Sequence, residues 1–414
     1  MSSPSAPPPP TVRPLRGRVA TAAWGAPALL APFLTPTSAP TSAPTSDRDD
    51  GELPAAEVWF GAHPARPSAV AVGRTSDPDG RWVPADRLPE AERPHVLVKL
   101  LAAGGPLSIQ VHPDDATAAA RAPEDPLGKP ELLRALGPMR ILCGLRPAAA
   151  SRALLSRLAP DAVPLLEALG HGDDGLAEAV ALVLRADRTA RAALLAAVLD
   201  GARALLAEPE PSAAAPATAT DVATRRAARL ALDLHERFPD DPGVVVALLL
   251  DDVDLAPGQR VFVAPGTPHA YLSGLGLEVM APSDQVLRGG LTVKPVDVDG
   301  FLDVLDARAP GLPTTATLPR RLDGTGWRRH VTPTDAFVVD EADVDGGPLV
   351  VERTGAAAGL LVCVAGTVHV RAGDGSVADV EAGEGALLAP GDDPVELEGQ
   401  GAVVHAVGRQ PGAG

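Results

Sequence analysis

The chain has 414 residues, a formal net charge of -17 and a pI near 4.9. This length allows two or three domains of roughly 150 residues, and the negative field argues against nucleic acid or an anionic membrane as a partner, because it repels phosphate groups. Two cysteines without motif spacing, and no apolar leader or membrane-length apolar stretch, favour a soluble protein of the reducing cytoplasm.

The N-terminal part of the chain combines low-complexity segments with short predicted strands. Residues 1–10 are rich in Pro and Ser, and residues 35–50 carry the repeat TPTSAPTSAPTS, so both are expected to be disordered. A strand is expected within 18–27, ending at Trp24. Residues 58–72 mix aromatic residues with Gly and Pro, which is typical of short strands and turns.

The segment PLSIQVHPDD follows a predicted buried strand at residues 96–101 (VLVKLL). In an extended chain alternate side chains share a face, so Gln110 and His112 point to one side while Ile109 and Val111 point into a core. Two potential metal ligands would then face a cavity. For this pair alone, the alternative is an edge-strand histidine beside a solvated glutamine.

A second pair of polar residues occurs in LGKPELL. The residue before a proline favours extended geometry, so Lys129 and Glu131 are expected to point to one side of the chain. An ammonium and a carboxylate would then reach the same cavity. Taken alone, the tripeptide KPE is also typical of a surface turn.

Residues 148–238 are rich in Ala, Leu and Arg, with apolar residues spaced by three and four, which predicts amphipathic helices. These helices would form a domain inserted into a β protein. His171 in a Gly/Asp turn and His235 on a helix have no ligand neighbour, so we interpret both as solvated or capping residues.

Strand-like sequence returns after residue 239. The patterns predict a short helix capped by Asp297 at 298–305, and strands at 244–250 (VVVALLL), 259–263, 276–280 and within 285–294. Between them lies APGTPHAYLSG, in which a strand ends in Pro-Gly before His269. A small β-barrel presents a ligand at its mouth in this way.

The C-terminal part, residues 327–407, has strand-like segments every 8 to 12 residues with Gly and Asp turns. This spacing favours a second antiparallel barrel or sandwich. His369 and His405 stand there without Glu or Gln at ligand spacing, so we interpret this part as structural.

Four motifs occur in one order along the chain: PLSIQVHP, KPEL, PHAYLSG and LEVMAPSDQVLRGGLTVK. Together with AAWG and AEVWFGAHP near the start, they closely resemble type I mannose-6-phosphate isomerase, a family of zinc enzymes in the cupin superfamily. The resemblance implies a mainly β fold with an inserted α domain: a cupin jelly-roll catalytic barrel, a helical domain and a second cupin-like β domain. The catalytic domain would comprise residues 11–147 and 239–300, the helical domain 148–238 and the C-terminal domain 301–414.

The resemblance also implies the residues of the site. One Zn2+ per chain would be held by Gln110, His112, Glu131 and His269. The active-site arginine falls on Arg288, and pocket positions fall on Trp24, Ser108, Lys129, Tyr271, Glu278, Asp284 and Lys294. The sequence departs from the family just before Trp24, where Ala22 and Ala23 replace the usual tyrosine.

The implied reaction interconverts mannose 6-phosphate and fructose 6-phosphate through an enediolate, whose negative charge a Lewis acid stabilises. Two neutral imidazoles, an amide oxygen and a carboxylate would leave zinc with a residual charge of about +1 and room for water or sugar oxygens. Arg288 would add fixed positive charge near O1 or O2. Lys294 and Ser108 would bind the phosphate, with Arg288 as an alternative. Either Glu278 or Lys129 would transfer the proton, and the sequence does not choose between them.

Two other functions fit the same motifs. One is a non-catalytic cupin that binds or senses a sugar phosphate, and the other is an isomerase acting mainly on a related phosphorylated sugar. In every case we expect a small sugar phosphate as the partner and a monomeric chain.

Overall fold

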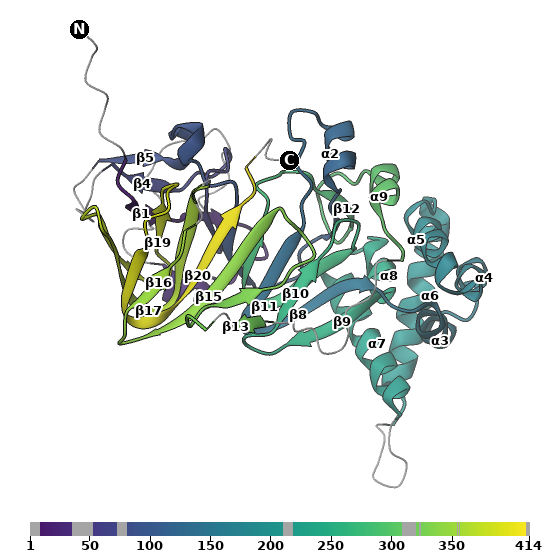
Figure 1. Cartoon of the computed structure of the whole chain (residues 1–414). Helices are drawn as coiled ribbons and strands as arrows, with labels where there is room; N and C mark the ends of the chain where they lie inside the picture. Colours follow the sequence, from purple (N-terminus) through teal and green to yellow (C-terminus); the bar gives the residue numbers. More distant parts are fainter. Residues whose placement is uncertain are drawn as a thin grey trace.

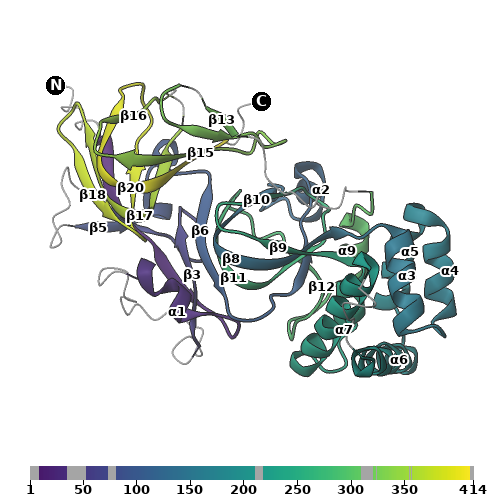
Figure 2. The same ribbon diagram turned by 90° about the horizontal axis from the view of Figure 1, so that it is seen from below.

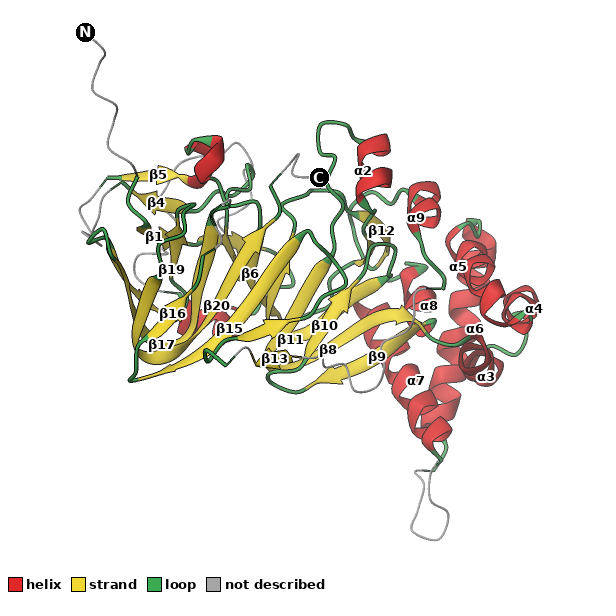
Figure 3. Ribbon diagram, viewed as in Figure 1, coloured by secondary structure: helices red, strands yellow, loops and turns green. Residues whose placement is uncertain are grey.

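The computed structural model describes residues 9–34, 53–72, 81–209, 218–308, 320–322, 324–353, 355 and 357–410. Most of residues 1–10 and all of 35–50, which are expected to be disordered, lie outside these residues. The described chain forms two antiparallel sheets side by side, with a group of helices packed at one end (Figures 1 and 3).

The sheet nearer the helices, called here the central sheet, has nine strands in the described chain. Their order is β10-β8-β11-β6-β3-β2; in addition β9 pairs with β8, and β7 lies between β11 and β12. Its strands are β2 (Arg18–Thr21), β3 (Ala55–Phe60), β6 (Leu97–Ala103), β7 (Ile109–Val111), β8 (Glu131–Leu145), β9 (Leu250–Leu255), β10 (Arg260–Val263), β11 (His269–Met280) and β12 (Leu287–Gly290). The predicted strands at 96–101, 259–263 and 276–280 are confirmed. Strand β6 is buried along its whole length, as its nearly continuous apolar sequence requires.

The other sheet, called here the terminal sheet, has eleven strands and joins both ends of the described chain. Its strands are β1 (Val12–Arg16), β4 (Ala69–Ala71), β5 (Trp82–Pro84), β13 (Arg320–Leu322), β14 (Arg328–His330), β15 (Phe337–Asp345), β16 (Leu349–Val351), β17 (Gly359–Ala372), β18 (Val377–Glu381), β19 (Gly385–Leu388) and β20 (Val395–Gly408). The predicted strands of 327–407 are confirmed. Strand β1 pairs with β19, so three strands from the first hundred residues belong to this sheet and not to the central one. The expected domain boundaries therefore do not coincide with the boundary between the sheets.

One hydrophobic core joins the two sheets. Phe60 and Leu100 of the central sheet share it with Leu360 and Val404 of the terminal sheet, and all four side chains are buried. Each fully buried Leu or Phe side chain contributes about 1.5–3 kcal/mol of transfer free energy. This shared core holds the sheets in a fixed relation to each other.

The predicted helices at 148–238 are confirmed. They lie between β8 and β9 in the chain and at one end of the molecule, as Figure 2 shows. These helices are α3 (Ala148–Leu158), α4 (Val163–Gly170), α5 (Leu176–Leu184), α6 (Arg188–Ala207) and α7 (Ala219–Arg237). None of the helices in the described part of the chain is long and apolar enough to cross a membrane.

The predicted strand at 244–250 is wrong. These residues form helix α8 (Gly243–Leu248), and every residue of the helix is buried. A short apolar run buried on all sides shows neither the period of a strand nor that of a helix, so its sequence does not distinguish the two.

Three further helices lie outside the group: α1 (Pro27–Leu30), α2 (Asp115–Arg121) and α9 (Val298–Val304). The predicted helix at 298–305 is confirmed as α9. The carboxylate of Asp297 caps it by accepting a hydrogen bond from the amide of Gly300.

Candidate metal centre

A cavity of about 640 Å³ opens between the central sheet and the helices. Ten of the predicted site residues line it: Trp24, Ser108, Gln110, Lys129, Glu131, His269, Tyr271, Glu278, Arg288 and Lys294. Ala22 and Ala23, where the sequence departs from the family pattern, form part of the same wall. The structure therefore gathers segments that are far apart in the sequence around one space.

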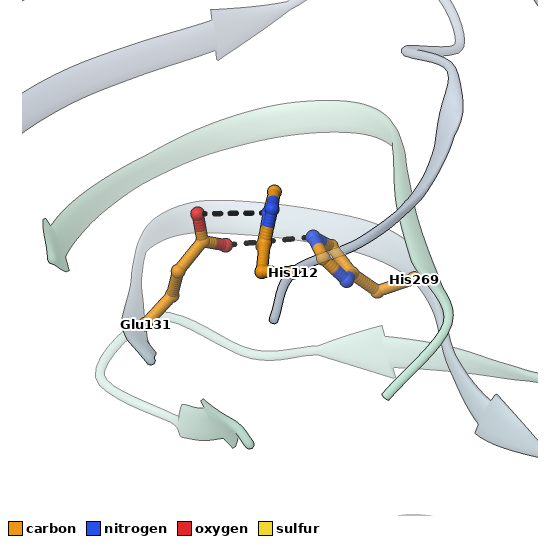
Figure 4. Close-up of side chains that lie close together, drawn as sticks. All are labelled: His112, Glu131 and His269. Atoms are coloured by element: carbon orange, nitrogen blue, oxygen red, sulfur yellow. Dashed lines mark ion pairs between the residues drawn. The ribbon is translucent and has the colours of Figure 1, made fainter. Parts of the chain in front are cut away.

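A group of three buried side chains lies at this cavity: His112, Glu131 and His269 (Figure 4). His112 follows β7, Glu131 is the first residue of β8 and His269 is the first residue of β11. Glu131 Oε1 lies 3.2 Å from His112 Nε2, and Glu131 Oε2 lies 3.4 Å from His269 Nε2. The ends of three strands thus converge on one point.

Backbone carbonyls fix which nitrogen of each imidazole carries hydrogen. His112 Nδ1 donates to the carbonyl of Gln285 at 2.9 Å, and His269 Nδ1 donates to the carbonyl of Thr267 at 3.0 Å. Because a carbonyl only accepts, each Nδ1 carries hydrogen, and in the neutral imidazole the Nε2 lone pair faces Glu131. Protein-bound metals commonly have histidine ligands held in this way by their other nitrogen.

The two Nε2 atoms and the carboxylate suit a bound cation. His112 Nε2 is buried and makes no hydrogen bond, although it lies close to Glu131. Burial lowers the pKa of His112 to about 4, so this imidazole stays neutral at pH 7. Two lone pairs facing a buried carboxylate are the donor set of a divalent metal site, and the residues present therefore fit a zinc ion.

Gln110 is placed to add a fourth ligand. It is the direct cross-strand partner of His269 on β11 and of Arg288 on β12, so their side chains are neighbours. Gln110 Nε2 donates to Ser108 Oγ at 2.9 Å. This contact uses the amide nitrogen and not the amide oxygen, which is the atom that can bind a metal.

Two buried carboxylates in the site have opposite pKa shifts. Burial, followed by the charge of Glu131, raises the pKa of Glu278 to about 7. Burial alone would also raise the pKa of Glu131, but nearby positive charge, including the Lys129 ammonium 3.4 Å from Oε1, holds it well below its usual value. Tyr271 donates a hydrogen bond of 2.7 Å to Glu278. Two carboxylates whose pKa values differ in this way can take different roles, one as a permanent anion and one as a proton carrier.

Lys99 and Glu57 also line the cavity, and neither was among the predicted site residues. Lys99 Nζ lies 3.6 Å from Glu57, 3.7 Å from Glu278 and 4.3 Å from the ring centre of Trp59. The signal that could have found Lys99 is its place inside the apolar run VLVKLL, since a lysine in a buried strand needs a charged partner.

Arg237 and Phe238, at the end of α7, were missed as well. Nothing in the periodicity of the helical segment distinguishes its last turn from the others. Arg237 and Phe238 reach the cavity only because of the way in which the helices pack against the central sheet.

Asp284 does not line the cavity. Its side chain is 77% exposed, and Oδ1 lies 3.3 Å from Nε2 of the buried His63. Asp125 holds this segment by accepting hydrogen bonds from the Asp284 amide and from the Ser283 hydroxyl, so the Asp284 carboxylate lies between His63 and solvent. A substrate-binding role for Asp284 has no support from these contacts.

A mainly β protein with a metal-ligand set in a polar cavity belongs to the class of metalloenzymes. Residues 14–148 match the family model of phosphomannose isomerase type I, catalytic domain. The chain is 30% identical to mannose-6-phosphate isomerase of Escherichia coli K12 over 375 residues, covering 84% of this chain and 90% of the bacterial protein. Mannose-6-phosphate isomerase 1 of Arabidopsis thaliana is 28% identical over 381 residues, covering 84% of this chain and 83% of the plant protein.

A solved structure agrees with these sequence comparisons. Mannose 6-phosphate isomerase from Salmonella typhimurium, bound to fructose 6-phosphate and zinc, aligns with a TM-score of 0.74 and 25% identity, covering 96% of this chain and all of that one (100%). The chain belongs to the mannose-6-phosphate isomerase family, type I.

Proposed function

We propose that this protein interconverts mannose 6-phosphate and fructose 6-phosphate, with one zinc ion bound by Gln110, His112, Glu131 and His269. The observation that carries the proposal is the buried cluster of His112, Glu131 and His269, with both Nε2 lone pairs turned towards the carboxylate. Family membership supports it, because the Salmonella typhimurium relative has been solved with zinc and fructose 6-phosphate. The contacts do not favour a non-catalytic sugar-phosphate sensor.

Zinc, when bound, supplies a Lewis acid for the negative charge that develops on the sugar oxygens. Arg288 supplies a second positive charge to the same cavity. It is the cross-strand partner of Gln110, and burial without a nearby charge lowers its pKa. A guanidinium that keeps its charge beside the developing oxyanion lowers the barrier without proton transfer of its own.

Glu278 is the proton carrier that the geometry favours. The reaction needs one group that takes the proton from C2, gives an enediolate, and returns the proton to C1, while the hydroxyl proton passes from O2 to O1. A carboxylate with a pKa of about 7 is well matched to both steps near neutral pH. Lys129 remains the alternative, but its ammonium lies 3.4 Å from Glu131 Oε1 and is held by that carboxylate.

The remaining assignments follow from the same arrangement. Lys294 and Ser108 bind the phosphate, and Trp24 and Tyr271 shape the cavity that they line. The central sheet forms a cupin jelly roll with 148–238 as an inserted helical domain, and 301–414, completed by β1, β4 and β5, form a second cupin-like domain. The two buried free cysteines support a cytoplasmic enzyme, and we keep the monomeric state as a prediction.

The decisive experiment measures bound metal and isomerase activity on the same sample. Protein stripped by a chelator should lose the interconversion of the two sugar phosphates, and added zinc should restore it. His269→Gln should lose both zinc and activity, whereas His369→Gln, which changes an exposed histidine of β17, should keep both. Full activity in protein shown to be free of metal would overturn the proposal.

A further inference from the structure

Three cations line the cavity without a carboxylate partner. Among the residues that the structure describes, Arg237, Arg288 and Lys294 have no carboxylate within ion-pair distance, although the chain carries a net charge of -17. By contrast, Lys99 and Lys129, in the same cavity, each lie within 4 Å of a glutamate. Unpaired positive charges around one space in an acidic protein create a local attraction for an anion.

The guanidinium of Arg237 lies close to a glycine on another segment of the cavity wall. A Cβ atom at Gly105 would lie 2.7 Å from Arg237 Nη1, and apart from the same guanidinium's Cζ nothing else lies within 4 Å of it. Gly105 does not have a positive φ angle, so its backbone does not require glycine. The space above Gly105 is therefore occupied by the guanidinium, and the segment from Gly105 to Ser108 lines the cavity beside it.

Helix α7 holds Arg237 at this place. A capping box formed by Thr218 and Asp221 starts the helix, and Arg226 binds Asp252 of β9 through a hydrogen bond of 2.6 Å from Nε. Just after the helix, Asp241 accepts hydrogen bonds from the amides of Gly243 and Thr292, which ties this segment to the strand end that leads to Lys294. The last residue of α7 is thus fixed relative to both walls of the cavity.

We propose that Arg237 binds the phosphate group of the sugar substrate and that Gly105 keeps the space its guanidinium needs. This inference rests on the proposed isomerase function. The reacting carbons C1 and C2 must lie near the metal ligands, so the phosphate on C6 needs a cation on a different wall of the cavity. A planar guanidinium suits a phosphate because it can donate two parallel hydrogen bonds. In this arrangement the inserted helices contribute directly to substrate recognition.

The test compares Arg237→Gln with Arg229→Gln, which removes an equal charge from an exposed position of α7 that does not line the cavity. In the zinc-loaded enzyme Arg237→Gln should raise KM for mannose 6-phosphate roughly 10- to 100-fold, the loss expected for hydrogen bonds to a charged group. The turnover number kcat should stay within about threefold, and competitive inhibition by inorganic phosphate should weaken by a similar factor. Arg229→Gln should leave all three unchanged.

Gly105→Ala provides a second variant that leaves the charge in place. The new methyl group should displace the guanidinium and raise KM in the same direction, with an unchanged unfolding temperature. The double variant Gly105→Ala/Arg237→Gln should have a KM close to that of Arg237→Gln alone, because both changes remove the same interaction.

An unchanged KM and unchanged phosphate inhibition in Arg237→Gln would overturn the inference, as would a lower kcat at constant KM. A lower unfolding temperature without a change in KM would show that Arg237 only stabilises the end of its helix. That result would also overturn the inference. If the wild-type protein shows no isomerase activity with zinc, the proposed function fails. Calorimetric binding of fructose 6-phosphate to wild type and Arg237→Gln then decides the inference separately.

Discussion

Arg288 and Glu278 occupy the same cavity but have different electrostatic surroundings. Arg288 has only burial acting on its pKa, whereas the pKa of Glu278 is affected first by burial and then by Glu131, Lys99, Lys129 and Tyr271. A fixed cation and a titrating carboxylate are therefore available in one site. Each role has a separate test.

Arg288→Ala should keep the zinc content and the fold but lower kcat roughly 10²- to 10³-fold, the loss typical of removing one group that stabilises an oxyanion. Steady-state kinetics with metal analysis on the same sample would measure this. Arg140→Ala, which removes an arginine that pairs with Asp252 away from the cavity, serves as the control. Turnover near that of wild type in Arg288→Ala would show that Arg288 takes no part in the catalytic step.

Glu278→Gln should lower kcat strongly and abolish the acidic limb of the pH profile of kcat/KM. The group must be ionised to act as a base, so wild-type activity should rise with pH through the pKa of Glu278, which is about 7 before a cation binds nearby. Bound zinc should move this limb to lower pH, because it stabilises the carboxylate. Tyr271→Phe should move it to higher pH, since it removes a hydrogen bond to the ionised form. If the acidic limb is still present in Glu278→Gln, a residue other than Glu278 transfers the proton.

Local sequence predicted the part of the site that depends on strand alternation. Gln110 and His112 were expected on one face because they are two residues apart in an extended segment, and both are at the metal centre. Glu278 and Lys99 could be brought to one place only by the pairing of β11 with β6, where they are direct partners. Asp284 was assigned from the motif alone, and its orientation is set instead by the hydrogen bond that its amide donates to Asp125, 159 positions away.

At the scale of elements, one buried ionic cluster connects the two sheets. Glu341 on β15 lies 2.8 Å from Arg134 on β8 and 2.5 Å from Arg260 on β10, and His330 on β14 lies 3.2 Å away. Arg134 and Arg260 belong to the central sheet, whereas Glu341 and His330 belong to the terminal sheet. Such a cluster stabilises the interface only while every charge keeps its partner.

Glu341→Gln should lower the free energy of unfolding by about 3–5 kcal/mol, because it leaves buried arginines without their carboxylate. Urea unfolding followed by circular dichroism would measure the change. Asp343→Asn, at an exposed neighbour on the same strand, should cost less than about 1 kcal/mol. Equal effects of the two substitutions would show that the cluster adds nothing to the interface.

The same carboxylate makes stability depend on pH. Burial alone would raise the pKa of Glu341, but His330 and the arginines outweigh it and hold the pKa well below its ordinary value of 4.5. The ionised form therefore stabilises the folded state above about pH 4.5, and this contribution is lost as the pH falls further. In Glu341→Gln the loss of stability below pH 4.5 should be smaller.

The sequence predicted most elements of the fold but not their assembly. Amphipathic periods predicted the helices of 148–238, and apolar runs predicted β6 and β10. The run VVVALLL was predicted to be a strand and is a helix, because a segment buried on all sides has no alternation of apolar and polar residues from which its period could be recognised. The placement of β1 beside β19 could not be read locally, since it depends on pairing between opposite ends of the chain.

At the scale of the whole molecule, the proposed metal would join parts of the chain on both sides of the helical insertion. His112 and Glu131 precede the insertion, and His269 follows it. A ligand that binds only the folded state stabilises it by about 2.7 kcal/mol when its concentration is a hundred times Kd. Metal binding should therefore be visible in unfolding as well as in catalysis.

Chelation should lower the thermal unfolding temperature, and zinc should restore it. His112→Gln should have a low unfolding temperature that no longer responds to zinc, whereas His369→Gln should respond like wild type. Differential scanning calorimetry with and without chelator would measure both. An unfolding temperature that stays constant after verified loss of the metal would contradict a zinc site at these residues.

The pairing of β1 with β19 has a consequence for biosynthesis. Val12 leaves the ribosome long before its partner Leu388, so the strand waits on the order of tens of seconds for one of its neighbours. A nascent polypeptide cut short before β19 would leave the β1 edge unpaired and open to association with other chains. Premature termination just before β19 should therefore yield aggregates, even though every residue that lines the cavity has already been translated.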